Sequence, residues 1–231
     1  AGENFSDWFQ GINPRSLVPV LVHDGEVHIE SNDILQYLEN YFDNNPLIPP
    51  GKEETVADLL RFEDDLHMDI RNITFKFLVP RFLTKGKSIE PKSQNKATLH
   101  GKSDIVDDQN RNFWKNFDEV GIQDEVAIAS LLRMKSALSD IDTELQKNKF
   151  ILGPKLSLLD IAWFIYATRL QNAGYPLKKF HPNVYLWFQQ LNADKSFNNE
   201  VKTPLPIRII TYLHYLFLKF NNRDIESLLK N

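Results

Sequence analysis

The sequence predicts a small α/β segment followed by an all-helical domain. Two short β-rich runs, 18–22 and 27–30, flank an Asp-Gly pair that is typical of a tight β-hairpin. A short helix is expected before the hairpin, ending near Asn13, and another after it, opened by Ser31. From Thr55 onward the apolar spacing is helical, and the fold class is therefore α/β plus all-α.

Composition excludes several classes of protein. The 231 residues are 42% hydrophobic and 25% charged, as in an ordinary globular protein. No Cys occurs, which excludes disulfides, thiolate metal sites and a Cys nucleophile. The net charge of −4 disfavours nucleic acid as a partner. We expect a cytoplasmic protein without a metal site.

The predicted domain boundaries follow changes in composition. Residues 1–45 form the α/β segment, 46–54 a linker rich in Pro, Asn and Gly, and 55–231 the helical domain. Inside that domain, 84–123 is a polar insert, either an anion-binding flap or a long solvated loop. Residues 205–231 are a C-terminal helical extension.

Three sequence patterns in the helical domain predict particular helices. Thr55–Phe82 reads as one long helix, bent before Pro80. Residues 127–145 place apolar side chains at alternating intervals of four and three, an amphipathic stripe. Ser157 is expected to cap a helix, with Asp160 as the acidic third residue.

The most apolar stretch is 205–220, and it is too short to span a membrane. Its charged residues Arg208 and Lys219 lie about 15 Å apart on a helix, against the roughly 30 Å of a bilayer core. We expect this stretch to dock on the helical domain, because so many large apolar residues are costly to leave in water. An interfacial membrane anchor is the alternative.

One constellation in the α/β segment indicates a binding site. Pro19 at the start of a strand removes a hydrogen-bond donor, which is understandable if the Val18-Pro19 bond is cis and the backbone turns toward a ligand. Ser31 offers a hydroxyl and unpaired N–H groups for a carboxylate, and Glu30 could accept from an ammonium. Together they would bind a small zwitterionic peptide. An ordinary hairpin with a Ser N-cap is the alternative.

These motifs resemble a known family. The segment SDWFQGINPRSLVPVLVHDGEVHIESNDILQYLENYF resembles the second half of the thioredoxin-like domain of a glutathione S-transferase. The acid-capped SLLDIAW and the following P-N-x-x-x-W-F resemble successive helices of the helical domain of that superfamily. SDWF-x-x-INPR, the HDG turn and the long polar insert are most similar to bacterial β-aryl-etherases. The resemblance implies that the first βαβ of the thioredoxin-like domain is absent from residues 1–45.

The resemblance implies a glutathione site. Val18, beside cis-Pro19, would pair with the cysteinyl backbone, Glu30 and Ser31 would hold the γ-glutamyl end, and Asn4 would lie near the glycine carboxylate. No residue matches the one that activates the thiol in this superfamily, so the catalytic residue is unknown.

The resemblance also implies an enzyme. Glutathione thiolate would attack a small hydrophobic or aromatic electrophile, for example to cleave a β-aryl ether, with Tyr166 and Asp65 lining the acceptor pocket. A non-catalytic binding or scaffold protein and a glutathione-dependent dehalogenase are the alternatives.

Members of this superfamily pair, so we predict a homodimer. Glu63, Asp64 and Asp65 are candidates for the subunit interface; together with Asp69 they could instead form a metal or acid–base site. Light scattering at micromolar concentration should give twice the mass of the chain, and a monomeric mass would refute the prediction.

Overall fold

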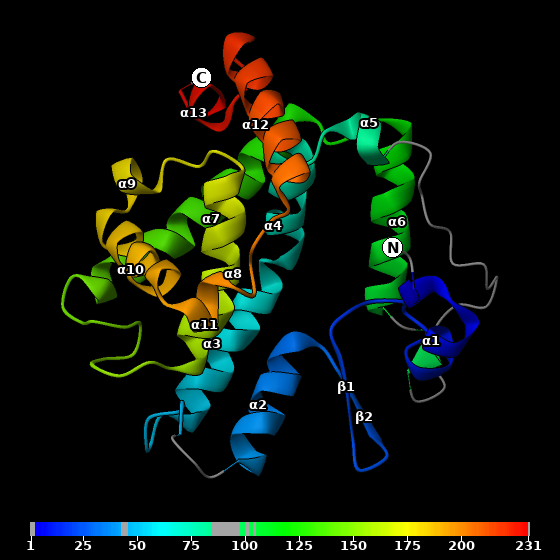
Figure 1. The fold of residues 1–231 in the computed structure, drawn as a ribbon, viewed down its shortest axis with the longest axis vertical. Helices are drawn as coiled ribbons and strands as arrows, with labels where there is room; N and C mark the ends of the chain where they lie inside the picture. Colours follow the sequence, from blue (N-terminus) through cyan, green and yellow to red (C-terminus); the bar gives the residue numbers. More distant parts are fainter. Residues whose placement is uncertain (1–2, 43–45, 85–97, 100–101, 104, 231) are drawn as a thin grey trace. The chain divides into compact units, whose positions relative to one another are not determined.

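A computed structural model of the chain describes residues 3–42, 46–84, 98–99, 102–103 and 105–230 (Figure 1). The chain divides into two compact units. Unit 1 consists of residues 1–44 and 84–121, and unit 2 of residues 45–83 and 122–231. Residues 84–121, which lie within the predicted insert, thus group with the N-terminal segment.

Unit 1 is built around an antiparallel hairpin. Strands β1 and β2 pair in a register that runs from Val20 opposite Ile29 to His23 opposite Glu26. Asp24 and Gly25 both have positive φ, 49° and 84°, as a two-residue type I′ turn requires. The elements of unit 1 are η1 (Glu3–Phe5), α1 (Asp7–Ile12), β1 (Val20–His23), β2 (Glu26–Ile29), α2 (Ser31–Tyr41), β3 (Thr98–Leu99), β4 (Lys102–Ser103) and α6 (Ile105–Glu119).

Tyr37 of α2 ties this helix to the hairpin. Its ring stacks on His28 with centroids 3.7 Å apart, and its hydroxyl lies 2.8 Å from Nδ1 of His23. The two histidines are not cross-strand partners, because His28 lies opposite Leu21. One aromatic side chain therefore contacts both strands.

Unit 2 is all-helical. In chain order it contains α3 (Glu53–Asp65), α4 (His67–Ile73), the π-helical turn η2 (Thr74–Leu78), α7 (Asp124–Leu145), α8 (Leu158–Asn172), α9 (Leu177–Phe180), α10 (Pro182–Ala193), α11 (Lys195–Asn198), α12 (Leu205–Phe220) and α13 (Ile225–Leu228). Helix α5 (Arg81–Thr84) lies where the sequence passes from unit 2 to unit 1.

The expectation of one helix over Thr55–Phe82 is wrong. The helix breaks at Leu66, whose N–H donates to the Glu63 carbonyl three residues back, at 3.0 Å. The Tyr166 hydroxyl donates to the same carbonyl at 3.1 Å. After α4, Val79 N–H donates to the Thr74 carbonyl five residues back, and the π-helical turn ends before Pro80.

The apolar stripe of α7 is confirmed as part of the core. Its members at intervals of four and three are all buried: Ala127, Leu131, Met134, Leu138, Ile141 and Leu145. Helix α7 contacts α4 and α10. Burial of such a stripe is the main contribution to the stability of a surface helix.

The prediction of a long solvated loop over residues 84–123 is wrong for the second half of that segment. Residues 105–119 form α6, in which Phe113 and Phe117 are buried and their rings are stacked. Asp107, only 1% exposed, is paired with Arg111 one turn later at 2.8 Å. The many acidic residues of this segment made it look like a loop, although it forms a helix with one apolar face. Residues 85–97 of the insert lie outside the described part of the chain.

Asp160 connects three parts of unit 2. Its carboxylate is fully buried and accepts from Ser157 N at 2.8 Å and Ser157 Oγ at 2.6 Å, which confirms the expected cap of α8. It also accepts from Ile151 N at 3.0 Å and from the Trp187 indole of α10 at 2.8 Å. One carboxylate therefore joins the start of α8, the preceding turn and α10.

Helix α12 docks on unit 2, as expected, through contacts with η2. Leu218 is its one buried residue, and Thr211, His214 and Tyr215 are partly buried on the same side. The opposite side of α12 is apolar and exposed, with Leu205, Ile209, Tyr212, Leu213, Leu216, Phe217 and Phe220. The docking thus leaves its most apolar face uncovered within the described chain. None of the described helices has the length and apolar content to cross a membrane.

We predict that Asp160→Ala lowers the free energy of unfolding by about 3 kcal/mol or more, because each hydrogen bond to a charged group contributes about 1.5–3 kcal/mol. Asp194→Ala is the control: Asp194 caps α11 in an exposed position by accepting from Ser196 N at 2.8 Å, and its loss costs about 1 kcal/mol. Urea denaturation of both variants measures the difference. Equal losses would contradict the central position of Asp160.

Candidate functional site

The residues expected to bind a ligand in unit 1 follow a loop fixed by buried polar side chains. In the loop 13–19, Asn13 donates through Nδ2 to the Leu17 carbonyl at 2.9 Å and accepts from Arg15 N at 3.1 Å. Ser16 has a positive φ of 55° and is buried, with its hydroxyl 3.1 Å from Nε2 of Gln10. These contacts fix the backbone immediately before Val18.

Val18 presents its backbone at the end of this loop. The Val18-Pro19 bond is cis, as expected, and Val18 is 68% exposed. Among the described residues, none hydrogen-bonds to its N–H or C=O. Pairing of the hairpin ends at Val20 opposite Ile29, and continuing that register brings Val18 opposite Ser31. An extended peptide could therefore pair with Val18 close to the start of α2.

Glu30 is held by an arginine that the sequence interpretation did not include. It precedes α2 with a φ of +69°, a conformation that costs free energy for a residue with a side chain. Its carboxylate is paired with the guanidinium of Arg15, which is 7% exposed. Arg15 thus fixes the direction of the Glu30 side chain between the loop 13–19 and α2.

Ser31 is the first residue of α2 and is exposed. The alternative in which Ser31 is an ordinary N-cap is not observed: Glu30 occupies the N-cap position, and its side chain makes no capping hydrogen bond. The first-turn N–H groups of a helix have no acceptor within the helix. Together with the Ser31 hydroxyl they form a site that suits a carboxylate.

Asn4 lies beside the same loop. Its Nδ2 donates to the Ser16 carbonyl at 2.7 Å, which occupies part of its donor capacity. The structure thus brings Asn4, Val18, Pro19, Glu30 and Ser31 into one unit. Their assignment to glutathione stays a prediction.

Tyr166 and Asp65 lie in unit 2 and differ in burial. Tyr166 is 3% exposed, its hydroxyl donates to the Glu63 carbonyl, and burial together with Glu63 raises its pKa. Asp65 is exposed at the end of α3. Glu63 is 4% exposed, so of the proposed interface residues only Asp64 and Asp65 present exposed side chains. The acceptor pocket at Tyr166 and Asp65 stays a prediction.

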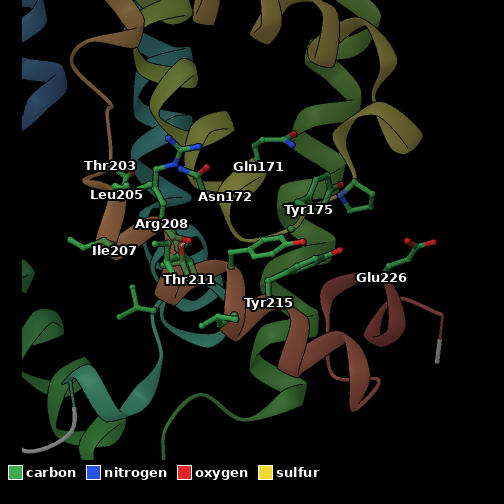
Figure 2. A pocket seen from close by; sticks show the side chains of 17 residues that line it. Gln171, Asn172, Tyr175, Thr203, Leu205, Ile207, Arg208, Thr211, Tyr215 and Glu226 are labelled. Carbon is green, nitrogen blue, oxygen red and sulfur yellow. Dashed lines mark hydrogen bonds between the residues drawn. The ribbon is translucent and has the colours of Figure 1, made fainter.

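A pocket of about 820 Å³ lies beneath α12, wholly within unit 2 (Figure 2). It is lined by the ends of η2 and α8, the turn into α9, and α12. Gly174 in that turn has a φ of +85°, and a Cβ added there would come within 2.7 Å of the Tyr215 ring. Glycine at 174 therefore permits both the turn and the close packing of Tyr215.

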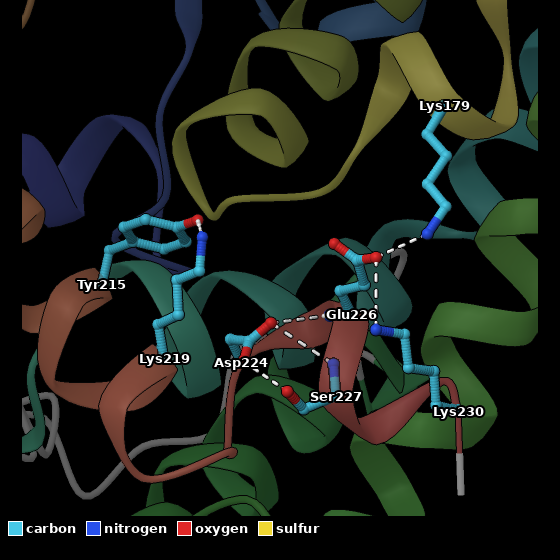
Figure 3. Close-up of polar contacts among 7 residues, drawn as sticks. All are labelled: Lys179, Tyr215, Lys219, Asp224, Glu226, Ser227 and Lys230. Carbon is cyan, nitrogen blue, oxygen red and sulfur yellow. Dashed lines mark hydrogen bonds and ion pairs between the residues drawn. The ribbon is translucent and has the colours of Figure 1, made fainter.

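The residues that follow α12 make polar contacts of their own (Figure 3). Asp224 caps α13 by accepting from Glu226 N at 3.1 Å and from Ser227 Oγ at 2.6 Å. Glu226 is paired with Lys179 at 2.5 Å and with Lys230 at 3.5 Å. Sequence reasoning missed the pocket, because an apolar stretch does not reveal which of its faces is covered; α13 lies within the helical extension expected over 205–231.

Unit 1 thus combines a β-hairpin with a cis-proline loop, and unit 2 is all-helical with a buried capping box. The family description "Glutathione S-transferase, N-terminal domain" matches residues 1–40, and "Glutathione S-transferase, C-terminal domain" matches 122–195. The resemblance to the glutathione S-transferase superfamily and the fold class expected from the sequence are both confirmed by these matches.

Individual relatives agree with this assignment. Protein LigF of Sphingobium sp. (strain NBRC 103272 / SYK-6) is 27% identical over 83% of this chain and 76% of its own length. The crystal structure of β-etherase LigF matches with a TM-score of 0.66 at 24% identity, over 85% of this chain and 82% of that one. Mouse glutathione S-transferase theta-1 is 23% identical over 83% of this chain and 68% of its own length.

We predict that His181 makes stability depend on pH. His181 is 1% exposed, its Nε2 lies 2.9 Å from the Tyr175 hydroxyl, and burial lowers its pKa below the usual 6.5. As pH falls below about 6.5, the unfolded chain binds a proton that the folded state resists, so the free energy of unfolding decreases. Above about pH 6.5, His181 is neutral in both the folded and the unfolded state, and its contribution to the free energy of unfolding no longer changes with pH.

Urea denaturation between pH 8 and pH 5 measures this slope. In His181→Gln the decrease should be smaller but not absent, because burial also lowers the pKa of the partly buried His214. An unchanged slope in the variant would contradict the assignment to His181.

Proposed function

We propose that this chain is a glutathione transferase in which the thiolate of glutathione attacks a small electrophile. The observation that carries the proposal is the juxtaposition of the unpaired Val18 backbone with the start of α2, where Glu30 and Ser31 lie. A γ-glutamyl tripeptide has the groups that this surface could bind: an extended backbone, an ammonium and carboxylates. Glutathione is thus a co-substrate rather than a resident group.

Within this class we propose cleavage of a β-aryl ether. The thiolate would attack the carbon that carries the ether oxygen, a carbon–sulfur bond would form as the carbon–oxygen bond breaks, and the phenolate would leave and take a proton from solvent. The similarity to the β-etherase LigF supports this choice among electrophiles. The homodimer and a cytoplasmic location belong to the same proposal.

Binding of the tripeptide tests the site. In calorimetric titration of the full chain, Ser31→Ala should bind glutathione about 10-fold to 150-fold more weakly, because a hydrogen bond to a charged carboxylate contributes roughly 1.5–3 kcal/mol. Since Ser31 is the first helical residue rather than the cap, the free energy of unfolding should change by about 0.5 kcal/mol or less. S-methylglutathione should bind to the wild type as well as glutathione does, because the thiol contributes nothing to these contacts.

Ser139→Ala is the matched control, because Ser139 is an exposed serine on α7 whose hydroxyl bonds only to its own helix, at Lys135 O. It should leave the affinity for glutathione unchanged. Absence of heat and of a thermal shift in the wild type at millimolar glutathione would refute the site.

Product analysis then identifies the electrophile. With glutathione present, release of a phenol from an aryl ether supports the proposed cleavage, and release of halide from an alkyl halide with no phenol from the ether would favour a dehalogenase. Binding of glutathione without turnover of either class would favour a non-catalytic binding protein.

A further inference from the structure

The two faces of α12 point the opposite way from those of an ordinary surface helix. A surface helix normally turns its apolar face toward the core and its polar face toward solvent. In α12 the side that packs on unit 2 carries Thr211, His214 and Tyr215, and Leu218 is its one buried residue. On the other side, six apolar side chains are more than half exposed: Leu205, Ile209, Tyr212, Leu213, Phe217 and Phe220. An apolar face of this size on a folded unit indicates an interaction site.

The charge of this segment is opposite in sign to that of the whole protein. Residues 201–223 contain four basic residues and no acidic one, although the chain has a net charge of −4. Two of the four, Arg208 and Lys219, lie within α12 and are exposed. They are eleven residues apart, or about three turns of an α-helix, so both border the apolar face along the same side.

No carboxylate of the described chain forms an ion pair with these cations. Lys202 donates to the Asn199 side chain at 2.7 Å, and Lys219 lies 3.5 Å from the Tyr215 hydroxyl (Figure 3). Both of these partners are neutral. Arg208 has no ion-pair partner among the described residues either. The border of the apolar face is therefore cationic.

The carboxylates next to α12 are already engaged elsewhere. Asp224 is 8% exposed and caps α13. Glu226 is paired with Lys179 and Lys230. Asp124, which lies near Arg223, is paired with Lys76. The positive charge beside the apolar face is thus not neutralised by these acidic residues.

A second copy of the chain does not fit this charge. An isologous interface brings the same surface patch of two subunits together. Pairing two α12 helices by their apolar faces would therefore place Arg208 and Lys219 against the same cations of the other copy, without an acidic residue in 201–223 to separate them. A partner that carries an apolar layer behind a layer of anions has the complementary chemistry, and an anionic lipid surface is such a partner.

The length and the side chains of α12 suit a helix that lies along a membrane. Its 16 residues extend about 24 Å, less than the roughly 30 Å of a bilayer core. Tyr212, Phe217 and Phe220 are aromatic residues that can lie at the boundary between headgroups and acyl chains. Arg208 and Lys219 have long apolar stems, so their charged ends can reach the headgroups beside the apolar face.

We propose that the exposed face of α12 binds the surface of a membrane that contains anionic lipids. The aromatic side chains would enter the boundary region, and Arg208 and Lys219 would contact lipid phosphates. Helix α12 stays docked on unit 2 through its other side, so docking and membrane association occur together. None of these residues belongs to the candidate glutathione site, and the proposal does not depend on that site.

Flotation with vesicles of two compositions tests the proposal. The full chain should float with phosphatidylcholine vesicles that contain about 30% phosphatidylglycerol, and it should bind at least about 10-fold more weakly to phosphatidylcholine alone. Raising the salt concentration from about 0.05 M to about 0.5 M should release much of the bound protein, because salt screens the attraction to the headgroups.

The aromatic contribution is measured with Phe217→Ser combined with Phe220→Ser. This variant should bind the anionic vesicles at least about 10-fold more weakly, because less apolar surface leaves water on binding. Phe82→Ser is the control, since Phe82 of α5 is 73% exposed and lies outside α12. It should bind as the wild type does. All three positions are exposed, so the thermal midpoints should equal that of the wild type.

The electrostatic contribution is measured with Arg208→Gln combined with Lys219→Gln. Each basic residue near an anionic surface strengthens binding by about 5-fold, so this variant should bind about 25-fold more weakly at low salt. Lys147→Gln combined with Lys155→Gln is the control, with the same change of net charge. Both of these lysines are exposed and lie near the start of α8, whereas α12 packs near its end.

Three results would overturn the proposal: equal binding to both kinds of vesicle, binding to neither, or an equal loss in the control lysine pair. If the wild type does not bind vesicles and is a dimer that the Phe217→Ser and Phe220→Ser variant converts to a monomer, a second copy covers the face instead. Ser31→Ala should float as the wild type does, with or without glutathione, which separates this result from failure of the glutathione site.

Discussion

The buried carboxylate of Asp160 is the contact on which unit 2 depends. It accepts four hydrogen bonds, from two atoms of Ser157, from Ile151 N and from the Trp187 indole, and these offset the cost of burying the carboxylate. Because α8 starts at this carboxylate, the direction of α8 is fixed there. The far end of α8 then carries the residues that border the pocket under α12.

Local patterns predicted the elements well where the signal lies within a few residues. The Asp24-Gly25 turn, the stripe of α7 and the capping box of α8 each depend on close neighbours, and each is present. The break between α3 and α4 could not be predicted in this way, because it falls at Leu66, and leucine is not a residue that interrupts helices. A contact that accompanies the break is remote in the sequence, since the Tyr166 hydroxyl donates to the Glu63 carbonyl.

The candidate site in unit 1 was predictable in part. The motif around Val18 and Pro19 and the position of Ser31 indicated where a peptide could bind. No spacing rule indicated that Arg15 would be buried and paired with Glu30, because that contact depends on the path of the loop 13–19. The pocket was not predictable either: the apolar residues of α12 suggested a buried face, whereas the structure turns Thr211, His214 and Tyr215 toward the bundle.

The outward apolar face of α12 determines how the protein responds to the composition of its solvent. Sulfate and phosphate are excluded from protein surfaces and strengthen association between apolar patches. With Phe217 and Phe220 60% and 89% exposed, concentrated ammonium sulfate should drive molecules together through this helix before other surfaces contribute. The same aromatic side chains should retain the protein on a phenyl-substituted chromatography matrix until the salt concentration is lowered, so a single helix governs its handling in purification.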